Sequence, residues 1–179
     1  MIKLLKIRDV KTPERGTAVS AGLDFFIPAF DKAFLDDFKS KNPNYCTLRP
    51  GNYSYYIAGE PDAGKILLGS GERLMIPAGI KMNVDANKAV VMFNKSGIAV
   101  KKGLIAGACV IDEDYQGEVH ISIINTSNHI IEINEGEKII QGLTLDVSYQ
   151  QPVMYDTHDL LYVDGTSERG IGGFGSTNK

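Results

Sequence analysis

The densest group of ionisable side chains in the sequence is the segment Ile111–Glu118, IDEDYQGE. Three carboxylates follow one another at 112–114, directly after the apolar run 109–111, which is typical of a buried strand. A strand that ends at Asp112 would hold this carboxylate rigidly, as a base that orients a water molecule must be held. Three neighbouring acids also suit Mg²⁺, which prefers oxygen ligands. A solvated acidic hairpin turn is the remaining interpretation.

A second group of residues whose types could do chemistry follows the strand-like run 88–93. The tetrapeptide Asn94–Gly97 supplies a cation at Lys95, a hydroxyl at Ser96 and a glycine, which together suit a phosphate. The phosphate-loop pattern GxxxxGK[ST] is absent, so an ordinary turn is an equal alternative. The run 137–141 is weaker still and by itself predicts an edge strand with polar residues facing solvent.

The last part of the sequence, 164–179, contains five glycines and almost no aliphatic residues. Such a segment cannot bury enough apolar surface to order itself alone. Phe174 lies between glycines and is followed by the hydroxyls of Ser176 and Thr177. These residues predict a flap that closes over a ligand, and a frayed terminus is the alternative.

Composition and charge exclude several function classes. The net charge of -3 argues against a nucleic-acid binder, which usually carries a basic excess. Cys46 and Cys109 lack the CxxC spacing of a metal or redox site and are typical of reduced cytosolic thiols. The N-terminal run 1–10 lacks a signal-peptide core, and no stretch approaches the ~20 apolar residues of a membrane span. The three histidines are scattered, and none sits in a catalytic motif. We expect a soluble cytoplasmic protein that binds neither nucleic acid nor membrane.

Short strand-like runs separated by turn signals extend along most of the chain. The clearest runs are 2–7, 73–76, 80–84, 88–93, 119–125, 129–133 and 138–147. Turn residues lie between them at 77–79, 102–103, 116–117 and 134–136. In 119–125 apolar and polar residues alternate, as in a strand with one buried face. Many short strands with regular turns predict an all-β sandwich, barrel or jelly roll.

One stretch departs from this pattern. Aromatic residues at 30, 34 and 38 fall on one helical face, which predicts a short helix over 30–38. From 42 to 71 the sequence is rich in Asn, Pro, Gly, Ser and Tyr, and we expect a long excursion from the β core. A chain of 179 residues without an internal repeat or a linker predicts one domain.

Five segments, in order along the chain, resemble the motifs of the trimeric dUTPase family. They are AGLD at 21–24, KSG at 95–97, VIDEDYQG at 110–117, GEK at 136–138 extending to Gln141, and RGIGGFGST at 169–177. The third and the fifth are the most specific. The resemblance implies an all-β, distorted jelly-roll or β-barrel-like domain over residues 1–163, with residues 31–71 as an insertion that contains the short helix. It also implies a homotrimer with shared active sites, in which the flexible glycine-rich arm 164–179 closes over a neighbouring site.

The resemblance implies a reaction as well, the Mg²⁺-assisted hydrolysis of dUTP to dUMP and pyrophosphate, which serves dUMP biosynthesis. Asp112 matches the carboxylate that activates the water attacking the α-phosphorus, and an aspartate is ionised at its reference pKa of about 3.9. Tyr115 matches the residue that packs under the deoxyribose and excludes a 2′-hydroxyl. The residues implied to contact uracil or deoxyribose are Tyr115, Phe174, Gly175 and the backbone around Cys109 and His120. Those implied to contact phosphates are Lys95, Ser96, Gly97, Gln141, Arg169, Ser176 and Thr177. Asp24 is implied as an indirect supporter of Mg²⁺, which the triphosphate itself chelates.

The sequence departs from the family pattern at three positions. Lys95 and Lys138 stand where arginine is usual, and Cys109 stands where glycine is frequent. Lysine keeps the charge but lacks the planar two-point contact of arginine. Within the same fold, dCTP deaminase is an alternative that the IDxDY pattern and the glycine-rich tail argue against. A dUTP-sensing regulatory protein with a protein partner at 31–71 is the alternative from another class, and a purely structural role leaves the five ordered motifs unexplained.

Overall fold

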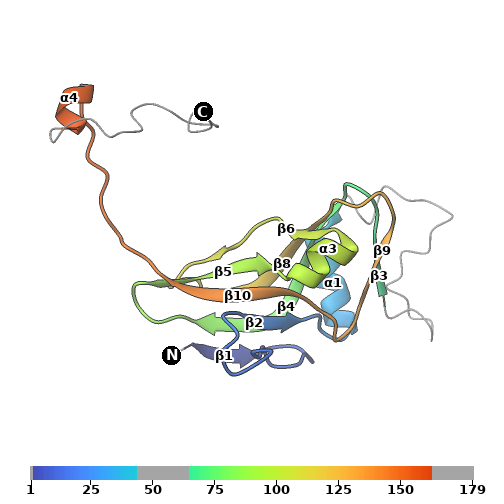
Figure 1. Cartoon of the computed structure of the whole chain (residues 1–179). Coiled ribbons are helices and arrows are strands. Elements are labelled where there is room, and N and C mark those ends of the chain that lie inside the picture. The colour runs from blue at the N-terminus through green and yellow to red at the C-terminus, as the bar shows by residue number, and fades with distance from the viewer. Residues whose placement is uncertain (1, 44–64, 163–179) are drawn as a thin grey trace. The chain divides into compact units, whose positions relative to one another are not determined.

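The computed structural model describes residues 2–43 and 65–162 of the chain, drawn in colour in Figure 1. The chain divides into two compact units, Met1–Ser148 and Tyr149–Lys179. All the described strands belong to the first unit, and the second contains one short described helix, α4 (His158–Leu161).

Two four-stranded sheets and a two-stranded ribbon make up the first unit (Figure 1). The first sheet has the order β1 (Lys3–Lys6), β4 (Arg73–Asn83), β8 (Glu118–Asn125), β6 (Leu104–Ala106). The second has the order β2 (Leu23–Phe26), β10 (Lys138–Asp146), β5 (Lys88–Asn94), β7 (Val110–Ile111). The ribbon pairs β3 (Lys65–Leu68) with β9 (Ile131–Asn134). Every pairing between these strands is antiparallel.

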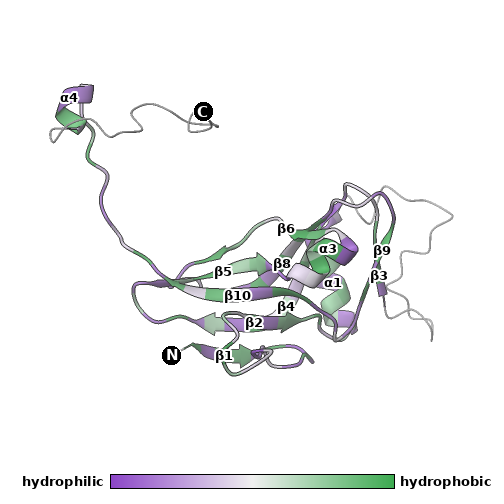
Figure 2. Ribbon diagram, in the orientation of Figure 1, coloured by the Kyte–Doolittle hydropathy of each residue, from purple (hydrophilic) through white to green (hydrophobic). Residues whose placement is uncertain are grey.

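Alternating side chains join the two sheets around one core. On β8 every second residue from Val119 to Asn125 is buried, as the sequence predicts for a strand with one covered face. Ile121 of the first sheet and Val90 of the second belong to the same buried cluster. Figure 2 shows hydrophobic and hydrophilic residues following one another along β2 and β10 of the second sheet. Two sheets that cover each other's apolar faces are the arrangement of a jelly-roll-like protein, so the predicted all-β fold is confirmed.

Helix α1 (Lys32–Lys41) forms where the aromatic spacing predicts a helix. Asp31 is its N-cap, and the Asp31 side chain accepts a hydrogen bond of 2.7 Å from the backbone N–H of Phe34. Phe34 and Phe38 are completely buried, with ring centroids 5.9 Å apart. The helix is therefore fixed to the core by its aromatic face.

Of the expected excursion over 42–71, the described residues at both ends belong to the core. Asn42 is buried; its side chain donates to the carbonyl of Met75 on β4 at 2.8 Å and accepts from the N–H of Met75 at 2.9 Å. At the other end, β3 pairs with β9 and buries Ile66 and Leu68. A short apolar run inside a polar stretch carries too weak a pattern to be identified as a strand.

The predicted turn at 77–79 is instead a bulge within one long strand. β4 continues through Pro77 and Gly79, and its register against β8 shifts between Pro77 and Lys81. Gly79 has φ 70°, in the left-handed region that glycine adopts without strain. A Cβ at Gly79 would lie only 2.9 Å from Cγ1 of Val10, so the close approach also requires glycine.

Two further elements differ from the local sequence patterns. Strand β10, whose start resembles an edge strand, lies between β2 and β5 in the second sheet. Residues Ser96–Lys102 form helix α3, which ends at Gly103 with φ 69°. None of the α3 side chains is buried, so the helix has no apolar periodicity by which it could be predicted.

The described part of the second unit, 149–162, exposes large apolar side chains. They are Tyr149, Val153, Met154, Tyr155, Leu160, Leu161 and Tyr162. Helix α4 begins after Thr157, whose hydroxyl accepts a hydrogen bond from the N–H of Leu160 at 3.4 Å. Among the helices of the described ranges, none has the length and apolar content to cross a membrane.

Candidate functional site

A buried carboxylate on β2 pairs with two lysines from distant parts of the chain. Asp24 is 4% exposed. The Nζ of Lys95 donates to Oδ1 of Asp24, and the Nζ of Lys138 lies 2.9 Å from Oδ2. Burial raises the pKa of Asp24, but the hydrogen bonds and charges of the two lysines outweigh it, so the pKa lies below its ordinary value. Asp24 is therefore an anion that holds two cations in place.

The two lysines line a pocket of about 520 Å³ at the junction of β5, α3 and β10. Its lining residues are Lys95, Ser96, Gly97, Ile98, Lys101, Glu137, Lys138 and Gln141. Three cations, a hydroxyl and an exposed glycine backbone are the groups that bind phosphate oxygens. Lys101 is not among the residues that the sequence predicts for this site. The only signal that could have identified it is its position one helical turn after Gly97.

Gln141 connects three of the segments singled out in the sequence. Its Nε2 donates to the carbonyl of Asn94 at 2.9 Å, at the end of β5. A Cβ added to Gly22 would lie 2.6 Å from the Oε1 of Gln141, so the backbone before β2 passes directly over this side chain. The segments around Asp24, Lys95 and Gln141 thus meet in one place, although they are far apart in the sequence.

Asp112 extends from the end of a paired strand, as its apolar neighbours predict. Ile111 is 8% exposed and lies opposite Val90 in the pairing of β7 with β5. Asp112 itself is exposed, and the N–H of Tyr115 closes a turn onto its carbonyl at 3.2 Å. The neighbouring Glu113 accepts a hydrogen bond from the N–H of Asn87 at 2.5 Å, which leaves Asp112 as the carboxylate beside a rigid strand end.

Tyr115 lies across the turn that joins β7 to β8. Its hydroxyl donates to the carbonyl of Glu118 at 2.8 Å. A Cβ at Gly117 would lie 2.3 Å from the Tyr115 hydroxyl oxygen and 2.4 Å from Cζ, so only glycine allows the ring to lie there. The side chain is also partly open to solvent, since 43% of Tyr115 is exposed. The turn therefore offers an aromatic surface next to Asp112.

The Asp112 turn and the lysine-lined pocket lie at opposite ends of β5. Ile111 pairs with Val90 near the start of that strand, whereas Lys95 follows its end. Five residues of extended chain separate Val90 from Lys95, which corresponds to about 17 Å. One chain alone thus does not place Asp112 beside this pocket.

The remaining predicted residues fall into two sets. The carbonyl of Cys109 accepts a hydrogen bond from the N–H of Met92 at 2.7 Å, and the Cys109 thiol is free and exposed. The ring of His120 lies beside Asp37 of α1 and is 17% exposed. Five predicted residues lie outside the described residues: Arg169, Phe174, Gly175, Ser176 and Thr177.

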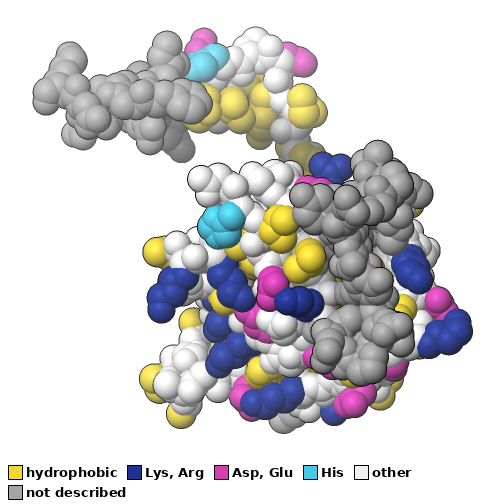
Figure 3. Space-filling view, turned by 90° about the vertical axis from the view of Figure 1, so that its right-hand side faces the viewer, with side chains coloured by type: hydrophobic (Ala, Val, Ile, Leu, Met, Phe, Trp, Pro, Cys, Tyr) yellow, Lys and Arg dark blue, Asp and Glu magenta, His cyan; other side chains and the backbone are white. Residues whose placement is uncertain are grey.

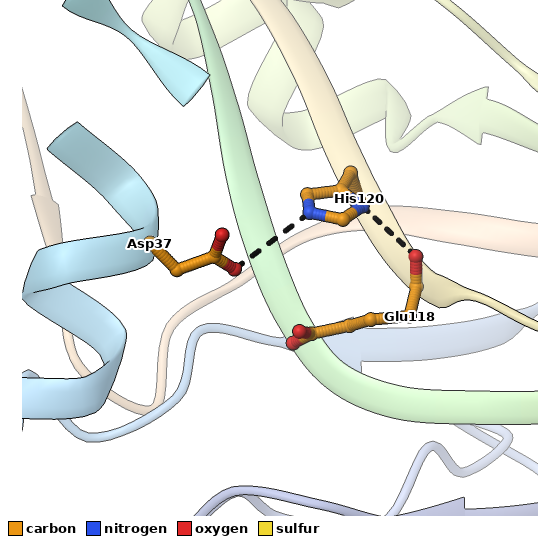
Figure 4. Close-up of side chains that lie close together, drawn as sticks. All are labelled: Asp37, Glu118 and His120. Atoms are coloured by element: carbon orange, nitrogen blue, oxygen red, sulfur yellow. Dashed lines mark hydrogen bonds and ion pairs between the residues drawn. The ribbon is translucent and has the colours of Figure 1, made fainter. Parts of the chain in front are cut away.

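A second cluster of polar side chains joins α1 to β8, and nothing in the sequence spacing indicates it. Asp37, Glu118 and His120 bring three ligand atoms within 4.8 Å of one another (Figure 4). The guanidinium of Arg8 already donates to both carboxylates, at 2.7 Å each. An arginine in that position neutralises the acids, so the cluster is an ion-pair network and does not fit a metal ion.

Charges are otherwise mixed over the surface. On the face drawn in Figure 3, basic and acidic side chains of the described residues lie interspersed. This agrees with the net charge of -3 and leaves the lysine-lined pocket as a local concentration of positive charge.

Comparisons with known proteins agree on one family. A family model described as dUTPase matches residues 63–178. The chain is 35% identical over 147 residues to a deoxyuridine 5'-triphosphate nucleotidohydrolase of Bdellovibrio bacteriovorus, covering 81% of this chain and 93% of that protein. It is 34% identical over 152 residues to the protein of the same name from Candida albicans, covering 83% and 87%. Among solved structures, the dUTPase of Staphylococcus bacteriophage 80alpha with dUpNHpp superposes with a TM-score of 0.68 at 18% identity, covering 98% of this chain and 97% of that one.

Proposed function

This chain belongs to the dUTPase family, and we propose that it hydrolyses dUTP to dUMP and pyrophosphate. The observation that supports this most directly is the likeness to the two nucleotidohydrolases, which extends over more than four-fifths of the chain. The geometry agrees with the reaction, because a carboxylate at a rigid strand end and a cationic pocket are both present.

Asp112 serves as the general base. Its carboxylate accepts a proton from a water molecule while the water oxygen bonds to the α-phosphorus. The bond from the α-phosphorus to the oxygen that bridges to the β-phosphate breaks, and pyrophosphate leaves with the electron pair. The exposed position of Asp112 after the buried Ile111 supports this role, because the carboxylate reaches solvent from a fixed backbone.

The phosphates bind in the lysine-lined pocket. Lys95 supplies charge, and Ser96 and Gly97 supply a hydroxyl and close approach of the backbone. Gln141, fixed by its bond to Asn94, completes the lining. Mg²⁺ carried by the triphosphate would neutralise charge as the pyrophosphate leaves. Both oxygens of Asp24 face lysines, so the contribution of Asp24 to the metal is indirect, through the placement of those lysines.

The hairpin turn recognises the nucleoside. The partly exposed ring of Tyr115 packs under the deoxyribose and leaves no room for a 2′-hydroxyl. Backbone groups around Cys109 and His120 contact the edge of uracil. The arm 164–179, which lies outside the described residues, brings Phe174 and Gly175 to the base, and Arg169, Ser176 and Thr177 to the phosphates.

A complete active site requires more than one chain, and we assign a homotrimer. The separation of Asp112 from Lys95 along β5 supports this assembly, because a single triphosphate must reach both residues. The exposed apolar side chains of 149–162 offer a surface for a neighbouring subunit. The assembled enzyme would act in the cytoplasm.

The test of the proposed function is pyrophosphate release with Mg²⁺ from dUTP, compared with dTTP, dCTP and UTP at equal concentration. We expect turnover of dUTP alone. Asp112→Asn should bind dUTP and lose turnover by about 10²–10⁴-fold, whereas Asp146→Asn, the same change at an exposed aspartate of the same sheet, should stay close to wild type. Binding of dUTP without release by the wild-type protein would favour a regulatory, nucleotide-sensing protein instead.

A further inference from the structure

The sugar-facing tyrosine of the proposed site is held by one backbone carbonyl. The hydroxyl of Tyr115 donates to the carbonyl of Glu118 at 2.8 Å, and its ring covers Gly117. The position of the aromatic ring therefore depends on where the backbone of Glu118 lies.

The side chain of Glu118 anchors that backbone through three hydrogen bonds, in addition to the pairing of Glu118 with Lys81 on β4. Its Oε1 accepts from Nε of Arg8 and from the N–H of Gly79, and its Oε2 accepts from Nη2 of Arg8, each at 2.7 Å. The two side chains are almost fully covered, at 10% and 12% exposure. A planar guanidinium bound to both carboxylate oxygens fixes direction as well as distance. Burial raises the pKa of Glu118. The hydrogen bonds from Arg8 and Gly79 outweigh this effect, so the pKa lies below its ordinary value and the carboxylate is held as an anion.

The ring of His120 shares the same carbonyl. Its Nδ1 lies 2.8 Å from the Glu118 oxygen, and because a carbonyl only accepts, Nδ1 carries the proton. The Glu118 carbonyl thus accepts from both Tyr115 and His120, which uses both of its lone pairs. The opposite nitrogen, Nε2, is buried, has no hydrogen-bond partner among the described residues, and lies 3.9 Å from Oδ2 of Asp37 (Figure 4).

Helix α1 reaches this network through a single side chain. Nη2 of Arg8, which donates to Oε2 of Glu118, also donates to Oδ2 of Asp37 at 2.7 Å. Asp37 stands on the same helix as Phe34 and Phe38, which are completely buried and fix the helix to the core. The preceding residue, Asp36, pairs with Lys32 on the exposed side of the helix.

We propose that Asp37, Arg8 and Glu118 form a positioning relay by which helix α1 sets the place of Tyr115 and thereby the preference for deoxyribose over ribose. This inference rests on the proposed function, since it assigns to Tyr115 the contact with the sugar. It adds that the selectivity depends on residues outside the hairpin, including one on the segment 31–71. Asp37 and Arg8 act through Glu118 and touch no substrate.

The test measures the ratio of kcat/KM for dUTP to that for UTP, together with the melting temperature. Asp37→Asn and Glu118→Gln should each lower the ratio by about fivefold, the size of one ordinary hydrogen bond. Asp36→Asn, the same change one position earlier on α1, should leave it unchanged. Tyr115→Phe removes only the hydroxyl and should lower the ratio by a similar factor.

Double variants separate a relay from a general loss of stability. In the Tyr115→Phe background, Glu118→Gln and Asp37→Asn should cause no further loss of selectivity, because the bond through which they act is gone. Losses that multiply, or a lower melting temperature with an unchanged ratio in Asp37→Asn, would refute the relay. If Glu118→Gln does not fold, the selectivity of Asp37→Asn decides whether the relay exists. This variant keeps the buried contact between Arg8 and Glu118 and should therefore fold.

Failure of the relay and failure of the proposed function give different results. The same dUTP-to-UTP ratio can be obtained from equilibrium binding of the two nucleotides. A wild-type protein that releases no pyrophosphate refutes the function, while the binding ratios of the variants still decide the relay.

Discussion

Replacing Asp24 with asparagine should destabilise the protein and weaken its phosphate pocket together. The carboxylate is 4% exposed, and each of its oxygens faces a lysine. In Asp24→Asn one oxygen remains as an acceptor, but the other position becomes an NH₂ group. That NH₂ would face the ammonium of Lys138 or Lys95 as donor against donor.

The expected loss of stability is about 2 kcal/mol, the value for a charge-assisted hydrogen bond to a covered group. We assign it to the contact with Lys95, whose side chain is 22% exposed. Lys138 is 47% exposed, and its contribution is taken as negligible because solvent screens it. For a chain of 179 residues, this loss corresponds to a melting temperature lower by about 4–8 °C.

The dependence on pH provides a second test of the same reasoning. The folded-state pKa of Asp24 lies below its ordinary value of 3.8. Its stabilisation is therefore complete above that value and is lost as the pH falls through the folded-state pKa. The difference in melting temperature between wild type and Asp24→Asn should stay constant near neutral pH and shrink below about pH 4.

Thermal unfolding at a fixed protein concentration measures the difference, because the proposed assembly would make the melting temperature depend on concentration. Asp146→Asn is the matched control, since its partner Lys88 also lies on the second sheet but Asp146 is 87% exposed. Equal melting temperatures for Asp24→Asn and wild type would refute the assigned energy. A difference that persists unchanged in acid would show that packing, and not charge, is responsible.

Three further outcomes test the site. Gly117→Ala should reduce the dUTP-to-UTP selectivity, because the new Cβ displaces the half-exposed ring of Tyr115. The melting temperature should change little, because the core is not displaced. Unchanged selectivity would mean that the sugar does not contact Tyr115. Chelating divalent cations with EDTA should abolish pyrophosphate release and added Mg²⁺ should restore it, whereas activity in EDTA would exclude a metal requirement. Mixing unfolded Asp112→Asn and Lys95→Ala chains and refolding them should restore part of the activity that each variant lacks alone, which a site within one chain could not do.

Periodicity in the sequence predicts the elements that bury one regular face. The alternation over Val119–Asn125 defines β8, and the spacing of Phe34 and Phe38 defines α1. Helix α3 buries no side chain, so nothing in its composition separates it from a turn. The bulge at Gly79 resembles a turn in sequence because both structures require a left-handed glycine.

The site was predictable only as far as its residues lie in recognisable motifs. Lys95, Ser96 and Gln141 are in such motifs, and the structure brings them into one pocket. That Asp24 would pair with both lysines depends on the order of strands in the sheet, which no local pattern specifies. The role of Asp37 cannot be predicted from the sequence either. Asp37 and Asp36 are neighbours on the polar face of the helix and have the same sequence surroundings.

Strand β2 has β10 as its neighbour in the second sheet, and this pairing sets the order of events during synthesis. Leu23–Phe26 leave the ribosome more than a hundred residues before Lys138–Asp146. At ordinary elongation rates the delay is roughly 6–22 s, during which β2 lacks this partner. The lysine-lined pocket, in which Asp24 of β2 holds Lys138 of β10, can therefore form only after β10 has been synthesised, and nascent chains that end before Asp146 should be unable to retain the nucleotide or resist proteolysis.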